Sequence, residues 1–338
     1  MHTDENASLP RVAVVGGGRW GQNIVRNAAE LGALATICDA DGERLETLQQ
    51  QYGVTTTQDF DTVLSDPLID AIMLATPAVT HAEMATRALT AGKHVFVEKP
   101  LALSLPDAEQ LIALADERDL VLMVGHLLWY HPAILELKRL VAEGALGSIQ
   151  YIYSHRLNFG RFRTEENILW SFAPHDISVI LGLLEELPNS VSAHGGSYLN
   201  ADIADVTVST LDFPSGARGH VFVSWLHPFR DHRLVVVGDK AMASFEDSPG
   251  GGALLFYDHQ IAWEASGPIP DRREAREIEY ADTEPLRQEI DHFLTCVTEG
   301  SRPRTDGPEG RNVLTVLDAC QTSLTLGQPM SVNSGVPT

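Results

Sequence analysis

Short apolar runs alternate with amphipathic segments through the first 125 residues of the chain. The first run starts at Val12 and ends at Gly16. Apolar runs between polar turns predict buried strands, and apolar positions spaced three and four residues apart predict helices between them. The other strand candidates are Leu34–Cys38, Gly53–Gln58, Asp70–Leu74, His94–Val97 and Leu120–Val124. Because these strands alternate with helices, we expect an α/β domain with a doubly wound parallel sheet.

The pattern changes after Gly125. Longer segments alternate apolar and polar residues, which predicts strands with one covered face and a mostly antiparallel sheet. These strand candidates are Ile149–Leu157, Asp205–Phe213, Ala217–Leu226, Arg233–Val237 and Met242–Glu246, and the expected helices are 132–143, 174–184, 284–298 and 308–326. Gly250–Gly252 is interpreted as a loose loop. We therefore expect a loose tail over residues 1–9, an α/β domain over 10–126 and an α+β domain over 127–338.

A glycine motif links the first strand to the first helix. Gly16, Gly18 and Gly21 follow the spacing G-x-G-x-x-G that is typical of dinucleotide-binding βαβ units. The first glycine permits the turn, the second lets a pyrophosphate approach the backbone, and the third lets the helix pack on the strand. The helix amides and dipole then face the phosphates. The motif therefore predicts a Rossmann domain.

An acidic residue at the end of the second strand indicates which dinucleotide is bound. Asp39 lies 18 residues beyond Gly21. A carboxylate there accepts hydrogen bonds from the adenosine ribose hydroxyls and repels a 2′-phosphate. Ala40, Asp41 and Gly42 follow it, with no arginine among them, and Asp41 is the better candidate for the cap of the next helix. The sequence therefore favours NAD as the cofactor.

Composition excludes several classes of partner and site. The chain has 338 residues and a formal net charge of −22, which argues against nucleic acid and anionic membranes as partners. No apolar run approaches the length of about 20 residues that spans a bilayer, and the polar N-terminus is unlike a secretion signal. The three cysteines are widely spaced, and no Cys/His metal spacing occurs. We expect a cytoplasmic protein with buried thiols and no metal.

The tripeptide Glu98-Lys99-Pro100 ends a predicted parallel strand, at the sheet edge where such folds bind ligands. A lysine near a nicotinamide ring can donate to a substrate oxygen and stabilise developing negative charge. Its ordinary pKa of about 10.4 must be lowered for it to act as a base. A surface lysine is the alternative interpretation of the tripeptide.

Four motifs taken together, GGGRWG, Asp39, ATPAVTH (75–81) and GKHVFVEKP (92–100), resemble the glucose-fructose oxidoreductase/inositol dehydrogenase/rhizopine-catabolism (Gfo/Idh/MocA) family. The resemblance implies an NAD(P)-dependent sugar oxidoreductase with Lys99 as a catalytic residue. It implies assembly as a homodimer or homotetramer through the C-terminal sheet. The resemblance also implies a set of cofactor-binding residues, which are Gly16, Gly18, Arg19, Trp20, Gly21, Asp39, Thr76, Pro77, His81, Glu98 and Lys99.

The segment 166–184 supplies a second site. Members of the family have an aspartate and a histidine four residues apart here; this chain has the histidine, His175, but Ser171 replaces the aspartate. Asp176 follows directly. Histidine suits proton transfer because its ordinary pKa is about 6.5. We therefore expect catalysis by Lys99 and His175, with the usual aspartate-assisted relay in doubt.

Three arginines lie in the run 156–163 with no acid among them. Guanidinium groups suit phosphate oxygens, and Phe159 or Tyr130 can stack on a base or sugar. A solvated loop is the alternative, but in so acidic a chain we favour anion binding. The predicted substrate-binding residues are Tyr130, Arg156, Asn158, Arg163, His175 and Asp176.

Within the family, the runs 125–133, 154–178 and 223–228 look most like a subgroup that oxidises the C3 hydroxyl of UDP-N-acetylglucosamine before an aminotransferase acts, in the synthesis of lipopolysaccharide or other cell-surface glycans. The resemblance implies a UDP-sugar substrate. UDP-N-acetylglucosaminuronate, a free sugar or a polyol remain alternatives, as does a non-catalytic NAD-binding sensor.

Overall fold

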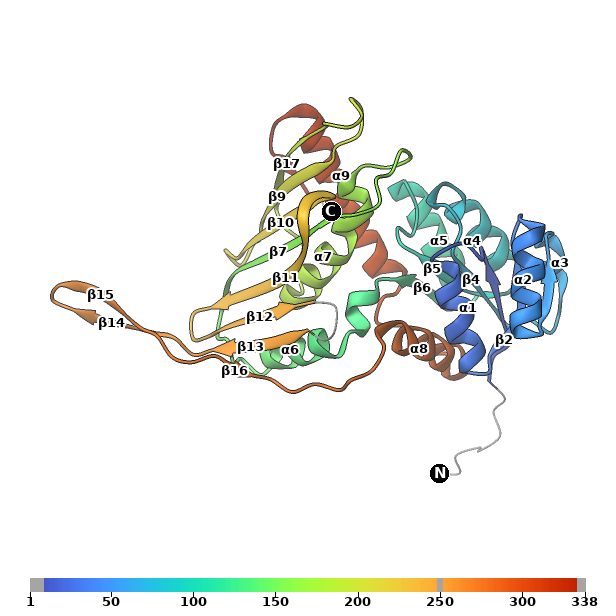
Figure 1. Ribbon diagram of the computed structural model, residues 1–338, viewed down its shortest axis with the longest axis horizontal. Helices are drawn as coiled ribbons and strands as arrows, with labels where there is room; N and C mark the ends of the chain where they lie inside the picture. The colour runs from blue at the N-terminus through green and yellow to red at the C-terminus, as the bar shows by residue number, and fades with distance from the viewer. Residues whose placement is uncertain (1–8, 248–251, 333–338) are drawn as a thin grey trace, which may run out of the picture. The chain divides into compact units, whose positions relative to one another are not determined.

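The computed structural model describes residues 9–247 and 252–332. The chain forms two compact units (Figure 1). One holds the chain up to Tyr130 together with Thr283–Leu314, and the other holds His131–Asp282 together with the chain from Thr315. Of the sequence predictions, the tail lies outside the described residues except for Leu9, and the Gly250–Gly252 loop lies outside them except for Gly252.

The first unit is built on a parallel sheet of six strands, which confirms the predicted α/β class. Its strands are β1 (Val12–Val15), β2 (Leu34–Cys38), β3 (Thr55–Thr57), β4 (Ala71–Leu74), β5 (His94–Glu98) and β6 (Leu122–Gly125). They lie in the order β3-β2-β1-β4-β5-β6, and each neighbouring pair is parallel. The strand order reverses at β1, so the carboxyl ends of β1 and β4 border the position where sheets of this type bind dinucleotides.

Helices connect these strands in the alternation that the sequence predicts. They are α1 (Gly21–Glu30), α2 (Gly42–Tyr52), α3 (Phe60–Ser65), α4 (His81–Thr90) and α5 (Leu105–Glu117), with short 3₁₀ turns η1 (Ala78–Thr80) and η2 (Leu127–Tyr130). The predicted cap of α2 is confirmed, because the Asp41 carboxylate accepts a hydrogen bond from the Arg44 amide at 3.1 Å. Such a cap contributes about 1 kcal/mol to helix stability.

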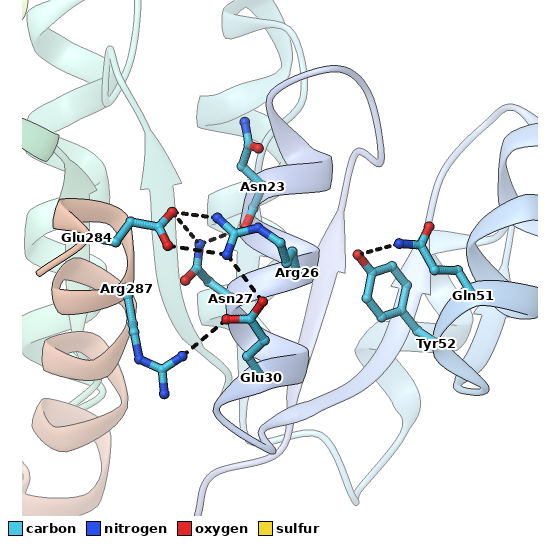
Figure 2. Close-up of polar contacts among 8 residues, drawn as sticks. All are labelled: Asn23, Arg26, Asn27, Glu30, Gln51, Tyr52, Glu284 and Arg287. Atoms are coloured by element: carbon cyan, nitrogen blue, oxygen red, sulfur yellow. Dashed lines mark hydrogen bonds and ion pairs between the residues drawn. The ribbon is translucent and has the colours of Figure 1, made fainter. Parts of the chain in front are cut away.

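Helix α8 (Pro285–Glu299) follows the second unit in sequence but packs on α1 of the first. Figure 2 shows the polar contacts, in which Arg26 of α1 forms two ionic hydrogen bonds with Glu284, at 2.5 and 3.2 Å. Phe293 of α8 packs edge-on against Phe96 of β5, with ring centres 5.9 Å apart. Exposed ion pairs contribute at most about 1 kcal/mol each. Apolar contacts such as that of Phe293 therefore supply most of the stabilisation.

The second unit contains a sheet of nine strands, mostly antiparallel as predicted. The strands are β7 (Ile149–Phe159), β8 (Ser190–Gly196), β9 (Val206–Asp212), β10 (Arg218–Ser224), β11 (Leu226–Gly238), β12 (Met242–Glu246), β13 (Ala253–Tyr257), β16 (Arg276–Glu277) and β17 (Met330–Ser331). They lie in the order β16-β13-β12-β11-β7-β10-β9-β8-β17. Within this sheet β7 and β10 form a parallel pair.

Helices α6 (Pro132–Ala142), α7 (Ile168–Leu184) and α9 (Gly307–Leu326) accompany this sheet, and α9 runs from the first unit into the second. The predicted start of α7 at Pro174 is wrong. The helix begins at Ile168 because the Asn167 side chain accepts a hydrogen bond from the Trp170 amide at 3.2 Å. Pro174 lies inside the helix, so its position was not a reliable signal for a helix start.

Several strands of the second unit were not predicted, among them the hairpin β14 (Gln260–Glu264) and β15 (Gly267–Asp271). The hairpin extends away from the nine-stranded sheet (Figure 1). Pro268 and Pro270 are unusual in a strand because proline cannot donate to a ladder. A two-stranded ribbon tolerates both, since each of its strands has an unpaired edge.

Candidate active site

The glycine turn has the geometry that its spacing predicts. Gly16 has a φ of +96°, and a Cβ added there would lie 2.7 Å from the Ala75 carbonyl oxygen. A Cβ on Gly21 would lie 1.8 Å from the Gly16 carbonyl oxygen. Gly18, in contrast, has no heavy atom within 4 Å of its added Cβ. The turn is therefore closed at its first and third glycines and open at the second, as a bound pyrophosphate requires.

Helix α1 begins without a capping side chain within the described part of the chain, since Trp20 at its N-cap makes no such hydrogen bond. Helix starts of this kind present amides and a positive dipole end to an anion. The Trp20 indole is 42% exposed and turns toward β5, where its Nε1–H donates to Glu98 Oε1 at 2.6 Å. The residues present therefore fit the diphosphate of a dinucleotide.

Asp39 is buried at the end of β2 and lies against the same turn. Its carboxylate accepts hydrogen bonds from the amides of Gly17 and Asp41, at 2.6 and 2.9 Å, and from the Arg44 guanidinium at 2.8 Å. Burial acts to raise the pKa of Asp39, but the hydrogen bonds outweigh it and the pKa lies below its ordinary value. Asp39 is therefore an anion at neutral pH. Arg44, which the sequence analysis did not single out, is its partner.

We expect Asp39→Asn to weaken NAD⁺ binding by about tenfold or more, since hydrogen bonds to a charged group contribute about 1.5–3 kcal/mol. The ratio of NADP⁺ to NAD⁺ affinity should rise because the negative charge is lost. Titration calorimetry with both dinucleotides measures the two effects. Asp41→Asn is the matched control, because asparagine caps a helix as well as aspartate does. Equal affinities of Asp39→Asn and the wild type for NAD⁺ would contradict the prediction.

A buried histidine forms hydrogen bonds with the segment after β4. His81 is 1% exposed, and its Nδ1 and Nε2 lie 2.7 and 2.9 Å from the carbonyl oxygens of Pro100 and Thr76. The ring therefore joins the loop after β4 to the loop after β5. Thr76 is partly exposed and Pro77 exposed. We propose that Thr76 and Pro77 contact the cofactor and that His81 acts through them.

Lys99 directly follows β5, at the carboxyl edge of the sheet where its position in the sequence predicts it. Glu98 precedes it and pairs in register with Gly125 of β6. A Cβ on Gly125 would lie 3.1 Å from the Glu98 carboxyl, so glycine makes room for that group. The edge that carries Lys99 is thus fixed from one side by the Trp20–Glu98 hydrogen bond.

The predicted substrate residues Arg156 and Asp176 form an ion pair inside the second unit. Arg156 of β7 donates from Nε to Asp176 Oδ2 at 3.0 Å and from Nη2 to Oδ1 at 3.2 Å. The Ser154 hydroxyl donates to the same carboxylate at 2.5 Å. Arg156 also reaches Nδ1 of His232 at 3.3 Å, a residue that the sequence analysis did not single out. The charge expected from Arg156 is therefore neutralised by Asp176.

Arg163 also has acidic partners. Its Nη1 lies 3.1 Å from Glu166 and 3.8 Å from Glu165. Arg161 and Phe159 are exposed. Asn158 places its Oδ1 in a buried position with no hydrogen-bond donor among the described residues. Two of the three arginines in the run, Arg156 and Arg163, therefore have acidic partners from outside it. Asn158 presents an acceptor to which a ligand hydroxyl can donate.

Tyr130 belongs to the first unit and does not fit the stacking role expected for it. The residue is 1% exposed, its hydroxyl bonds Thr305 at 3.0 Å, and the Arg304 guanidinium covers its ring at 5.0 Å. Its ring therefore has no face left for a base or sugar.

His175 lies in α7, one turn after Ser171, which is 3% exposed. His175 belongs to the second unit and Lys99 to the first.

Among residues 9–247 and 252–332 no cluster of histidine, cysteine, aspartate or glutamate suitable for a metal ion occurs. In the same residues no helix is long and apolar enough to cross a membrane. The three cysteines are buried, as predicted.

Comparisons with known proteins agree with this geometry. Residues 10–126 match the family model "Oxidoreductase family, NAD-binding Rossmann fold", and residues 134–244 match "GFO/IDH/MocA C-terminal domain". UDP-N-acetylglucosamine 3-dehydrogenase of Acidithiobacillus ferrooxidans is 28% identical over 90% of this chain and 94% of its own length. The scyllo-inositol 2-dehydrogenase (NAD(+)) of Bacillus subtilis is 28% identical over 96% of each chain.

A solved structure of the Acidithiobacillus ferrooxidans enzyme superposes with a TM-score of 0.83 at 25% identity and covers 94% of this chain and 97% of its own. Both halves of the fold are thus matched. The chain belongs to the Gfo/Idh/MocA family of oxidoreductases, and its first unit is the NAD-binding Rossmann domain of that family.

Proposed function

We propose that the protein is an NAD-dependent dehydrogenase that oxidises the C3 hydroxyl of UDP-N-acetylglucosamine to a ketone. The main support is the near full-length similarity to UDP-N-acetylglucosamine 3-dehydrogenase, in sequence and in fold. The runs 154–178 and 223–228 carry the same resemblance. The product, a 3-keto sugar nucleotide, suits a following transamination.

The proposed chemistry divides between proton and hydride. The glycine turn and Asp39 would hold NAD⁺, which would supply the acceptor for the hydride from C3. Lys99 or His175 takes the hydroxyl proton, and the cationic form of Lys99 stabilises negative charge that develops on the oxygen. Trp20 and Glu98 hold the sheet edge that carries Lys99. In the second unit the Arg156–Asp176 pair fixes the strand next to α7, and Asn158 is proposed to accept a hydrogen bond from the sugar.

The direct test mixes purified protein with UDP-N-acetylglucosamine and NAD⁺ and follows NADH absorbance. A coupled aminotransferase with an amino donor removes the ketone and draws the reaction forward. We expect NADH and a 3-amino sugar nucleotide. Absence of both in the coupled assay would refute the proposed substrate, and tight NAD⁺ binding without turnover of any sugar or polyol would support a sensor.

A polyol or free sugar is the second candidate. The observation that favours it is the pairing of Arg156 with Asp176 and of Arg163 with Glu166, which reduces the positive charge available to a diphosphate. The similarity to an inositol dehydrogenase points the same way. UDP-N-acetylglucosaminuronate is a further sugar nucleotide for the same assay.

Arg163→Ala separates these candidates. If the substrate is a UDP-sugar, we expect KM to rise about tenfold or more, because an ionic hydrogen bond contributes about 1.5–3 kcal/mol. A polyol should show an unchanged KM. Arg218→Ala is the control, since Arg218 is an exposed arginine of β10 whose partner is Asp212. Steady-state kinetics with both substrate classes provide the measurement.

We also propose that the protein assembles as a homodimer or homotetramer through the open face of the nine-stranded sheet. Tyr151 of β7 and Val208 of β9 are 39% and 44% exposed there. Exposed apolar side chains on a sheet are typical of an interface. Light scattering of the purified protein measures the mass.

A further inference from the structure

Glu289 of α8 is a buried carboxyl group that the proposed reaction does not use. Its exposed fraction is 0%, and neither of its oxygens has a hydrogen-bond donor among the described residues. Burying an ionised carboxylate without partners costs several kcal/mol, so such groups are either paired or neutral. A neutral carboxylic acid, unlike a carboxylate, has an O–H that it can donate to an acceptor.

The packing of α8 on β5 places Glu98 beside Glu289. Phe293 of the helix contacts Phe96 of the strand. Glu289 is one helical turn, about 6 Å, before Phe293. Glu98 is two residues after Phe96, on the same strand face and about 6.6 Å along it. The two carboxyl groups are therefore similarly far along their elements from the aromatic contact, and the charge of Glu98 acts on Glu289.

The surroundings make the two members of this pair different. Glu98 accepts the Trp20 indole N–H and lies near Lys99 and His126, which both act to lower its pKa. The titratable groups near Glu289 are Glu98 of β5 and Tyr130 of η2. Burial first, and then the charge of Glu98, raise the pKa of Glu289 well above its ordinary value. Burial also raises the pKa of Glu98, although the hydrogen bond from Trp20 and the charge of Lys99 act to lower it.

We propose that Glu289 of α8 and Glu98, the residue before Lys99, form a carboxyl pair that holds one proton, with Glu289 as its neutral member. Glu289 is then a positioning residue that acts through Glu98. Its proton lets two carboxyl groups lie together while Glu98 keeps a single negative charge, which holds Trp20 and faces Lys99. The link to catalysis rests on the proposed dehydrogenase activity. The presence of one proton in the pair does not depend on that activity.

Infrared spectroscopy of the full-length protein tests the proton directly. At pH 7 we expect the wild type to show a carboxylic-acid C=O stretching band that disappears in Glu289→Gln and stays in Glu98→Gln. Asp291→Asn, which removes an exposed carboxylate from the same helix, should keep the band. Absence of the band in the wild type, or its survival in Glu289→Gln, would overturn the proposal, as would its loss in Glu98→Gln alone.

The dependence of stability on pH gives a second test without substrate. A carboxyl whose pKa is raised by folding binds its proton more tightly in the folded state, so stability falls as pH rises above the unfolded value of about 4.3. The Tm of Glu289→Gln minus that of the wild type should therefore increase steadily from about pH 5 to pH 8. A difference that does not change with pH, as expected for Asp291→Asn, would overturn the proposal. Glu289→Met supplies the same comparison if the glutamine variant does not fold.

The positioning role is tested in the dehydrogenase assay. As the pH rises and Glu289 ionises, its negative charge favours the protonated form of nearby Lys99. Glu289→Gln cannot ionise, so the limb of the kcat/KM profile that reports proton loss from Lys99 should move to lower pH by about one unit. An unchanged profile would overturn the positioning role. If no substrate is turned over, the proposed function fails, but the infrared band and the Tm difference still decide whether the pair holds a proton.

Discussion

Replacing Lys99 by glutamine should lower kcat of the dehydrogenase by about 10²–10⁴-fold, the usual contribution of one acid–base group. Lys99 directly follows β5, at the carboxyl edge of the parallel sheet. Glutamine keeps a hydrogen-bond donor, on a slightly shorter side chain, but has no charge and cannot take a proton. The loss should therefore appear in kcat, measured by NADH formation at saturating substrate.

Lys240→Gln is the matched control for Lys99→Gln. Lys240 is an exposed lysine in the turn between β11 and β12, and we expect its replacement to leave kcat unchanged. Circular dichroism should show the same fold for both variants. A kcat of Lys99→Gln within tenfold of the wild type would contradict the catalytic role of Lys99. It would leave His175 as the candidate for the proton acceptor.

The first unit could be predicted from the sequence because its signals are local. The apolar runs of β1 and β4 are strands buried along their whole length, and glycine or an acidic cap marks where the chain turns. Gly16, Gly18 and Gly21 act within a single turn, so their spacing alone carries their geometry. The observed order of the six strands is the usual one for a dinucleotide-binding domain, which the glycine motif predicts.

The second unit was less predictable because its elements depend on distant partners. Strand β8 ends in two glycines, which weaken a strand, and it is stabilised by pairing with β9. The prolines of β15 argue against a strand until the partner strand β14 is known. Local propensity decides neither case, since strand formation depends on what lies beside the segment.

In the candidate site, too, features set by local sequence could be predicted, and features set by contacts between distant segments could not. The positions of Asp39 and Lys99 at strand ends could be predicted from the alternation of elements. The pairing of Arg156 with Asp176 could not, because strand and helix contribute one residue each. The role proposed for Glu289 depends on α8 packing against β5, a contact between segments far apart in the sequence. The Glu165 and Glu166 partners of Arg163 are adjacent in sequence and were a usable signal.

Alanine at Gly21 should destabilise the first unit by about 3 kcal/mol, at the upper end of what an added methyl group costs in a packed interior. The new Cβ would lie 1.8 Å from the Gly16 carbonyl oxygen, which belongs to the backbone and cannot rotate away. The better helix propensity of alanine offsets only about 1 kcal/mol. Denaturant titration measures the loss, and NAD⁺ binding should fall with it because the same turn holds the phosphates.

Gly18→Ala provides the contrast that separates folding from cofactor binding. Its Cβ would enter open space, so we expect the stability of Gly18→Ala to stay close to that of the wild type. NAD⁺ binding should nevertheless weaken, because the methyl group occupies the side from which a pyrophosphate approaches the backbone. Calorimetric titration of both variants gives the comparison. If Gly21→Ala were as stable as Gly18→Ala, the tight contact between α1 and the turn would not be what holds this glycine in place.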